Sequence, residues 1–276
     1  MYIQFNDIEL QKTLQNASIA TVKMGSHLYG CSTPSSDTDY LCIYVEGIKN
    51  ANSFVWEHHP FQFKTDYADW NYTTLQKFIR NLINGDSPHN FEVLYSEEFA
   101  TSDLSWLLKY RSHFSNYNLI RSYLGLVKRD MKDFNKELHG VDRSNITTLG
   151  YKKLAHAYRG LDTAINMMVN NPYQYHTKGE SVVLERHKNM KTGNVTSNEI
   201  RHYRAWIENN LESVRNQLND MLSSHTIHKI MSPEIAKELD DELMNFCQSI
   251  VYKSKEVDYI DYRLIPYSAI ENGVSY

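Results

Sequence analysis

The chain has 276 residues, of which 41% are hydrophobic and 22% charged, and its formal net charge is −4 at pH 7. This length allows one large domain or two modest ones, and the composition is that of an ordinary soluble protein. No apolar run approaches the roughly 20 residues of a membrane span, and no secretory pattern opens the chain, so a cytoplasmic protein without a membrane partner is expected. The acidic balance does not indicate non-specific nucleic-acid binding, although a local basic groove can still accept RNA.

The first 70 residues contain one helix signal and three strand signals. Apolar residues at helical spacing predict a helix over residues 5–14, and the β-rich stretch 18–24 predicts a strand that ends at Gly25-Ser26. The apolar run 39–45 predicts a second strand. Partial alternation over residues 61–70 predicts a third strand.

Helix signals dominate the rest of the chain. An amphipathic pattern predicts a helix that begins near residue 75 and ends near Gly85, and Ser87-Pro88 begins a shorter one. After about residue 100, apolar spacing predicts four long helices, over residues 119–138, 154–168, 200–221 and 235–250. Thr196 and Glu199 have the spacing of a capping box before the third of these. The polar stretch 171–194 is expected to form a mobile loop.

These elements together predict an α+β fold. A small domain with a mixed sheet is expected over residues 1–105, and an all-helical domain over residues 106–276, with the boundary near residues 96–116.

The segment around the second strand contains the residues best suited to chemistry. Gly25-Ser26 ends one strand and begins a short helix, so its backbone N–H groups and hydroxyl can bind an anion. Asp37 and Asp39 are spaced by two residues, which places both carboxylates on one face of a strand, where they can bind a divalent cation. A metal site beside a phosphate site is what transfer from a nucleoside triphosphate requires.

A third carboxylate is expected from a neighbouring strand, because two metal ions need about three carboxylates. Asp66 and Asp69 are the candidates, and Asp69 is preferred because we expect it at the end of its strand, immediately before the helix. Taken alone, residues 35–39 are as consistent with a polar turn as with a metal site. The upstream Gly25-Ser26, the strand on each side and the later aspartate favour the metal site.

These residues resemble the DNA polymerase β-like nucleotidyltransferase superfamily. Its signature is a Gly-Ser followed by a glycine and then Asp-x-Asp, which Gly25-Ser26, Gly30 and Asp37-Thr38-Asp39 match. The chain is also similar to the bacterial and phage branch of predicted nucleotidyltransferases associated with RNA repair. The segments that carry this similarity are residues 25–30, 33–39, 69–78 and 151–159. His27 departs from that branch, which often has an arginine at this position.

The resemblance implies a Mg²⁺-dependent transfer of a nucleoside monophosphate from a nucleoside triphosphate (NTP), expected to be ATP, to a hydroxyl group. Two Mg²⁺ ions, or Mn²⁺, would be held by the catalytic residues Asp37, Asp39 and Asp69. The acceptor can be an RNA or tRNA end, a nucleotide or a protein. A nucleotide-binding regulator or adaptor that has lost turnover is the alternative function. The residues expected to bind the nucleotide are Gly25, Ser26, His27, Tyr29, Lys152, His156 and Arg159.

The last three of these residues share one face of the helix whose apolar residues run from 154 to 168. At 100° per residue, Lys152, His156 and Arg159 fall within about 60° of one another, opposite the apolar stripe. If the stripe packs inside the helical domain, this basic face is free to bind the triphosphate or the backbone of the acceptor. A basic face that only contacts solvent is an equally weighted interpretation.

Overall fold

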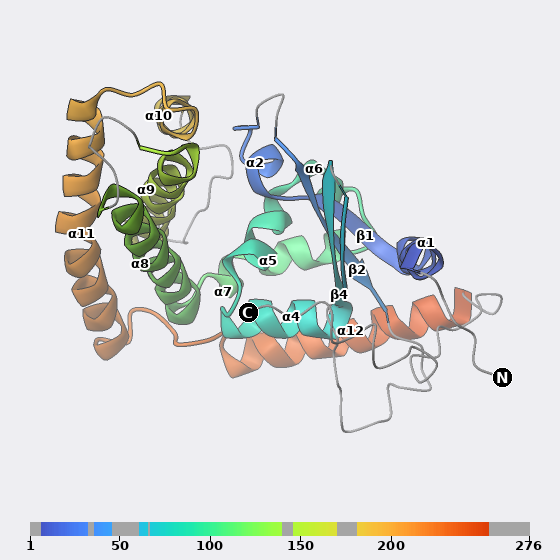
Figure 1. Ribbon diagram of the computed structural model, residues 1–276. Coiled ribbons are helices and arrows are strands. Elements are labelled where there is room, and N and C mark those ends of the chain that lie inside the picture. Colours follow the sequence, from blue (N-terminus) through green and yellow to red (C-terminus); the bar gives the residue numbers. More distant parts are fainter. Residues whose placement is uncertain are drawn as a thin grey trace.

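A four-stranded mixed sheet lies beside a layer of long helices (Figure 1). The computed structural model describes residues 7–32, 36–45, 61–65, 67–139, 146–169 and 181–253. The strands are β1 (Ser18–Lys23), β2 (Thr38–Tyr44), β3 (Phe61–Lys64) and β4 (Ala68–Thr74), in the order β1-β2-β4-β3. The two central strands, β2 and β4, run parallel, whereas each edge strand is antiparallel to its neighbour. The predicted α+β fold is therefore confirmed.

The predicted single strand over residues 61–70 is wrong, because the chain turns back between β3 and β4. The Thr65 hydroxyl accepts hydrogen bonds from the backbone N–H groups of Tyr67 and Ala68 at 3.4 and 3.0 Å, which closes the turn. Alternation of apolar residues continues through this turn without a glycine or proline, so the sequence pattern hides it. Asp69 therefore lies near the start of β4 rather than at its end. Asp66 lies outside the described residues.

The sheet is covered on both faces (Figure 1). Helix α1 (Asp7–Ala17) packs on one face over a small cluster that contains Leu14, Cys42 and Tyr72. On the other face, Leu41 and Ile43 belong to the main hydrophobic core. Successive residues of β2 point to opposite faces, so the odd-numbered positions of this strand, including Asp39, face the main core and the helical layer.

One short helix follows β1, and the other short helices connect the sheet to the long helices. They are α2 (Gly25–Leu28), α4 (Leu75–Asn84), α5 (Pro88–Glu92), η1 (Val93–Tyr95), α6 (Glu97–Ala100), η2 (Ser105–Tyr110) and α7 (Arg111–Phe114). The predicted helix from residue 75 to Gly85 is confirmed by its two caps: the Thr74 side chain accepts the N–H of Lys77, and Gly85 has a φ of 70°.

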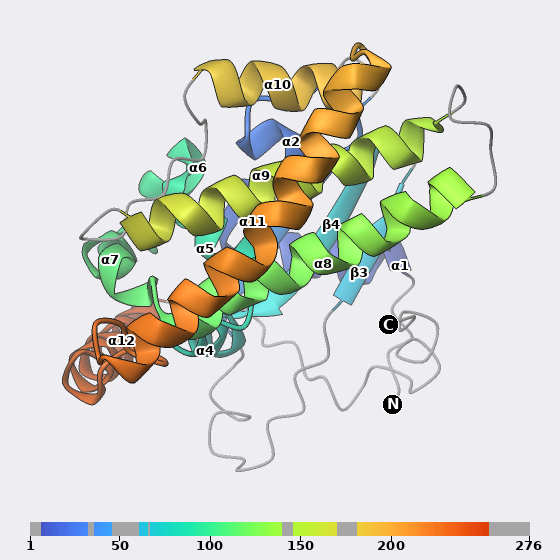
Figure 2. The same cartoon turned by 90° about the vertical axis from the view of Figure 1, so that its left-hand side faces the viewer.

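Four helices form the helical layer: α8 (Tyr117–His139), α9 (Thr148–Val169), α10 (Ser181–Lys191) and α11 (Ser197–Ser223). Helix α11 crosses the outer side of α8 and α9 (Figure 2). The predicted capping box is present, since Thr196 and Glu199 exchange both hydrogen bonds. The predicted loop over residues 171–194 is wrong for the part that forms α10. Its polar composition concealed the buried His187 and Met190, which anchor α10 in the core.

Helix α12 (Pro233–Lys253) leaves the helical layer and packs along α4 (Figure 1). The N–H of Met231 donates to the carbonyl of Ile83 at 3.1 Å, and Trp106 packs against Phe246 with ring centroids 5.6 Å apart. One hydrophobic core includes residues from the sheet, the helical layer and α12. The domain boundary at residues 105 and 106 stays a prediction.

No helix in the described part of the chain combines the length and the apolar character that crossing a membrane requires.

Candidate functional site

Three aspartates meet at one end of the parallel strand pair. The register of β2 and β4 places Asp39 directly beside Asp69, and Asp37 immediately precedes β2. One carboxylate oxygen from each of these residues lies within 4.8 Å of the others. We call Asp37, Asp39 and Asp69 the acid cluster. Carboxylate oxygens are hard ligands of the kind that Mg²⁺ and Mn²⁺ prefer, so these side chains suit a divalent cation.

The negative charges of the acid cluster are poorly compensated. Burial, followed by the charges of Asp37 and Asp69, raises the pKa of Asp39. Lys64 donates to Asp69 at 2.9 Å, but the Lys64 side chain is 71% exposed, so water screens this pair. A cation that bound between the carboxylates would relieve their mutual repulsion.

The turn at Gly25-Ser26 lies against the acid cluster. The N–H of Met24 donates to the carbonyl of Asp39 at 2.7 Å, which joins the end of β1 to the start of β2. Gly25 has a φ of 59°, and a Cβ atom at this position would lie 2.5 Å from a carboxylate oxygen of Asp39. Glycine is therefore required both for the backbone conformation and for the close approach of the carboxylate. His27 lies 3.3 Å from the Thr38 hydroxyl, so α2 also contacts β2.

The Tyr29 hydroxyl bonds to a buried carboxylate that the sequence analysis missed. Glu92 is 1% exposed and accepts a hydrogen bond from the Tyr29 hydroxyl. It also accepts from Tyr123 at 2.9 Å and from Arg159 at 3.0 Å, and His89 lies 3.3 Å away. The Arg159 guanidinium lies 3.6 Å from the centre of the Tyr29 ring. We call these five residues the Glu92 network; it joins α2, α5, α8 and α9.

Glu92 is ionised in this network. Burial alone would raise its pKa, but the Arg159 guanidinium and the hydrogen bond from His89 outweigh burial and hold the pKa well below its usual range. Arg159 therefore forms a buried ion pair rather than part of a solvent-facing basic surface. The signal in the sequence was a glutamate inside the apolar run 91–94, because a charge buried among such residues needs a partner.

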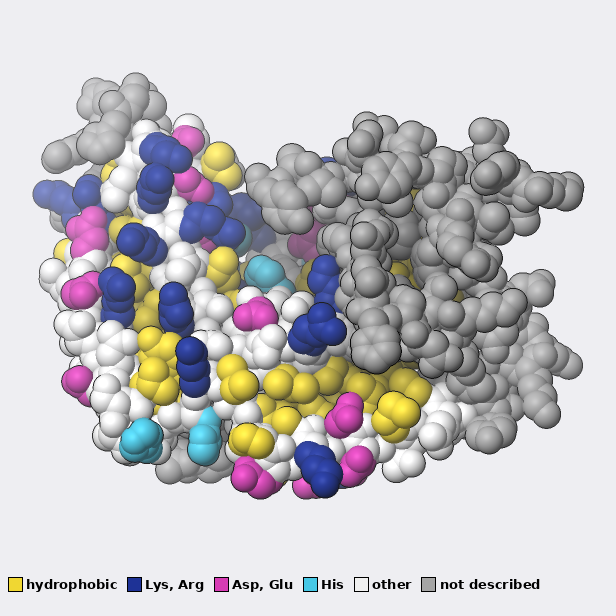
Figure 3. All heavy atoms as spheres, turned by 90° about the horizontal axis from the view of Figure 1, so that it is seen from below, with side chains coloured by type: hydrophobic (Ala, Val, Ile, Leu, Met, Phe, Trp, Pro, Cys, Tyr) yellow, Lys and Arg dark blue, Asp and Glu magenta, His cyan; other side chains and the backbone are white. Residues whose placement is uncertain are grey.

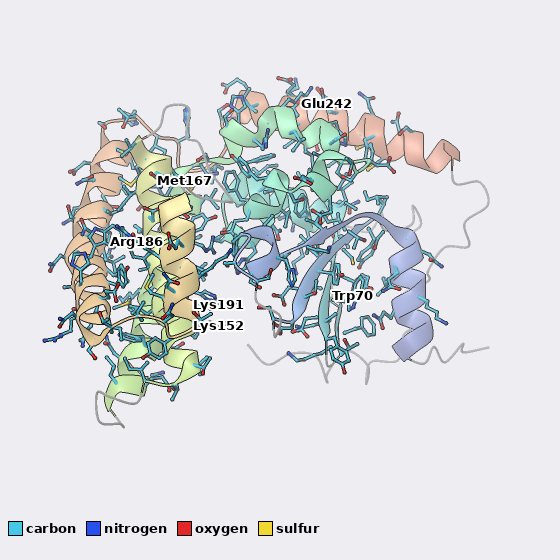
Figure 4. All side chains as sticks on the ribbon, turned by 90° about the horizontal axis from the view of Figure 1, so that it is seen from above. Trp70, Lys152, Met167, Arg186, Lys191 and Glu242 are labelled. Atoms are coloured by element: carbon cyan, nitrogen blue, oxygen red, sulfur yellow. The ribbon has the colours of Figure 1, made fainter. Side chains whose placement is uncertain are left out.

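Two lysines of the helical layer face α2 and the sheet. Lys152, on α9, and Lys191, at the end of α10, lie on this side of the layer (Figure 4). The charge of Lys152 acts on Asp39 and favours its ionised form. Lys191 donates to the Ser36 hydroxyl at 3.3 Å, next to Asp37 in the chain. We call Lys152 and Lys191 the basic wall; Lys191 was missed because its segment was expected to be a loop.

His156 does not add a charge to the basic wall. Its ring stacks on that of His187 with centroids 5.9 Å apart. Burial, then the neighbouring His187 and Arg159, lowers the pKa of His156 to about 2, so the ring is neutral at pH 7. Burial likewise lowers the pKa of His187 to about 3.

The structure thus separates the residues expected at the site into two groups. Gly25, Ser26, His27 and the acid cluster lie together at the end of the sheet, and Lys152 faces them from α9. Tyr29, His156 and Arg159 lie deeper, where they connect the sheet to the helical layer.

One comparison with known proteins covers most of the chain. The model of RlaP, described as the RNA repair pathway DNA polymerase beta family, matches residues 3–241. A solved nucleotidyltransferase-like protein from Exiguobacterium sibiricum 255-15 is similar at 13% identity over 91% of this chain and 94% of that chain. Its TM-score of 0.34 is too low to support a functional argument. A search of curated proteins found no match. Because the family match covers most of the chain, with the acid cluster inside it, the chain belongs to the RNA repair pathway DNA polymerase beta family, whose fold and signature are those of a nucleotidyltransferase.

Proposed function

We propose that the protein is a divalent-metal-dependent nucleotidyltransferase, which moves a nucleoside monophosphate from an NTP to a hydroxyl acceptor. The observation that carries this proposal is the acid cluster, in which three poorly compensated carboxylates lie within 4.8 Å of one another beside Gly25-Ser26. A fold that needed these side chains only for packing would bury and pair them, as it does Glu92, whereas the ion pair of Asp69 is with the exposed Lys64.

In this proposal, Asp37, Asp39 and Asp69 hold two Mg²⁺ ions, and Mn²⁺ suits the same oxygen ligands. Bound metal would neutralise charge on the reacting phosphate and lower the pKa of the acceptor hydroxyl. Ser26 and the backbone N–H groups at the start of α2 bind the β- and γ-phosphates, since no side chain caps this helix.

The basic wall binds the triphosphate from the opposite side. Lys152 and Lys191 supply positive charge that faces the acid cluster, and Lys191 also holds the segment before Asp37 through Ser36. Residues 1–105 would then act as the catalytic domain, and the helical layer as the nucleotide-facing part of residues 106–276. The donor is an NTP, with ATP as the first to test, and an RNA or tRNA end is the first acceptor to test.

The direct test incubates the protein with each labelled NTP, Mg²⁺ and a set of acceptors that includes RNA, tRNA, nucleotides and protein. We expect transfer by the wild type and none by the Asp37→Ala/Asp39→Ala variant. Asp220→Asn, which changes an exposed carboxylate on α11, is the matched control and should remain active. Transfer retained by the double variant would contradict the proposal. Tight NTP binding by calorimetry without any transfer would instead indicate a regulator or adaptor.

A further inference from the structure

A second surface feature lies on the helical layer and shares no residue with the acid cluster, the Glu92 network or the basic wall. It is a groove of about 630 Å³ between the first half of α8 and the second half of α11. Its apolar lining includes Leu124, Leu211 and Leu218, and its cations are Arg121, Lys128 and Arg215. This volume is within the range of ligand sites.

Positive charge prevails along the groove, although the whole chain is acidic. Glu212 is the one acidic residue among those that line it, and it lies 3.7 Å from Arg215. Arg121 and Lys128 form no ion pair with any residue that the structure describes. On the face seen from below, Lys and Arg side chains form a row over the part of the molecule that contains α8 and α11, with hydrophobic side chains beside them (Figure 3).

The spacing of the two unpaired cations indicates an extended anion. Arg121 and Lys128 are separated by two turns of α8, which places them on the same face and about 10.5 Å apart along the helix axis. A single compact anion needs cations that converge on it. These two cations instead suit a ligand with repeated negative groups.

Gly125 lies between these two cations, and the fold does not explain it. A Cβ atom at Gly125 would meet nothing within 4 Å, whereas at Gly160 it would lie 3.0 Å from Val127 on the packed side of α8. Gly125 has no positive φ that would require glycine. Glycine inside a helix is less stable than alanine, so its presence here points to a use: it keeps the space above the α8 backbone open to a ligand.

We propose that this groove binds single-stranded RNA. Arg121 and Lys128 contact two phosphates of one strand, and the bases lie over the partly exposed Leu211. Tyr117 offers an aromatic ring at the end of the groove, where its hydroxyl donates to Asn219 at 2.9 Å. The choice of RNA among polyanions rests on the proposed function, in which an RNA end is the first acceptor to test.

The test measures binding of a fluorescent single-stranded oligouridylate to the full chain by anisotropy, with EDTA present and no NTP, over a range of NaCl concentrations. Each phosphate contact to a single strand contributes about 0.7 to the slope of log K against log[NaCl]. We therefore expect Arg121→Ala/Lys128→Ala to lower this slope by about 1.4 and to weaken binding roughly tenfold at moderate salt. Arg129→Ala/Lys136→Ala removes two cations that α8 already pairs with its own acids, and should have a much smaller effect.

Gly125 provides an independent arm of the test. Gly125→Trp should block the groove and weaken RNA binding strongly, whereas Gly125→Ala, which adds a single methyl group to the open space, should weaken RNA binding only slightly. Equal RNA affinities for the two double variants would overturn the proposal, and so would a wild type that binds a polyglutamate peptide but not RNA. Because this assay contains neither metal nor NTP, its failure leaves the proposed transfer to other acceptors unaffected.

Discussion

The protein holds carboxylates in two opposite ways, in the acid cluster and at Glu92. Glu92 is buried and receives hydrogen bonds or an ion pair from four side chains, which keep it ionised. Asp39 is only partly buried, lies beside two other carboxylates, and has a raised pKa. The fold therefore satisfies Glu92 completely, whereas among the described residues the acid cluster has one ion pair, between Asp69 and the exposed Lys64.

The Glu92 network and the acid cluster have different roles in the molecule. The Glu92 network joins α2, next to the Gly25-Ser26 turn, to α8 and α9, so it fixes the position of the sheet relative to the helical layer. The acid cluster contributes nothing comparable to the packing, because its members lie at the end of the sheet and one of them is exposed. Mutations in the two places should consequently affect different measurements.

The largest effect on stability is expected from Glu92→Ala. This change leaves the Arg159 guanidinium partly buried without its carboxylate, and breaking a buried ion pair in this way costs about 3–5 kcal/mol. Urea denaturation followed by circular dichroism measures the loss. Glu98→Ala, on the exposed side of α6, is the control and should change stability little. If Glu92→Ala lowered the free energy of unfolding by less than about 1 kcal/mol, Glu92 would not stabilise the fold more than the acid cluster does.

Metal binding should act on the acid cluster alone. At a Mg²⁺ concentration 100 times its dissociation constant, we expect the free energy of unfolding to rise by about 2.7 kcal/mol. Asp39→Asn should abolish this rise, while its own stability without metal should equal or exceed that of the wild type because one repelling charge is gone. A Mg²⁺-dependent shift in melting temperature that survives in Asp39→Asn would place the metal elsewhere.

As the pH falls, the buried histidines should reduce the free energy of unfolding at a higher pH than Glu92 does. Burial lowers the pKa of His187 to about 3 in the folded chain, whereas its ordinary value is 6.5. Below pH 6.5, His187 therefore binds a proton in the unfolded chain but not in the folded chain. Stability should therefore fall with pH by up to about 1.4 kcal/mol per unit for this residue, down to about pH 3. Glu92 contributes in the same direction only below its ordinary pKa of 4.5.

Denaturation curves between pH 6 and pH 5 isolate the contribution of the histidines. His187→Gln should flatten the dependence on pH in this range, and Glu92→Gln should not. An unchanged slope in His187→Gln would show that this histidine is charged or solvated in the folded protein.

The smallest effect is expected from Lys64→Ala. Lys64 competes with any cation for a carboxylate oxygen of Asp69, but its exposed position screens the interaction. Calorimetry should show Mg²⁺ binding that is tighter by no more than a few fold. Weaker binding of Mg²⁺ by this variant would mean that Lys64 helps to orient Asp69 rather than to compete for it.

Patterns within a few residues were enough to predict much of the fold. The apolar runs that became β1 and β2, the capping box at Thr196, and the helix that ends at Gly85 all depend on local spacing. Local spacing also selected Asp37 and Asp39, because residues two apart share one face of a strand. The need for a third carboxylate from a neighbouring strand also selected Asp69, although the predicted position of Asp69 at the end of that strand was wrong.

The residues that the sequence did not reveal are those whose roles depend on distant partners. Glu92 and Arg159 are 67 positions apart, and no local pattern joins a glutamate in an apolar run to an arginine on a later helix. Lys191 belongs to a polar segment that is helical because His187 and Met190 pack against α9. The sequence by itself determined the local elements, the carboxylates and the Gly25-Ser26 turn, since these follow from backbone periodicity. Only the tertiary structure decided which charges are neutralised inside the fold and which face outward, because burial and pairing are properties of residues that meet in space.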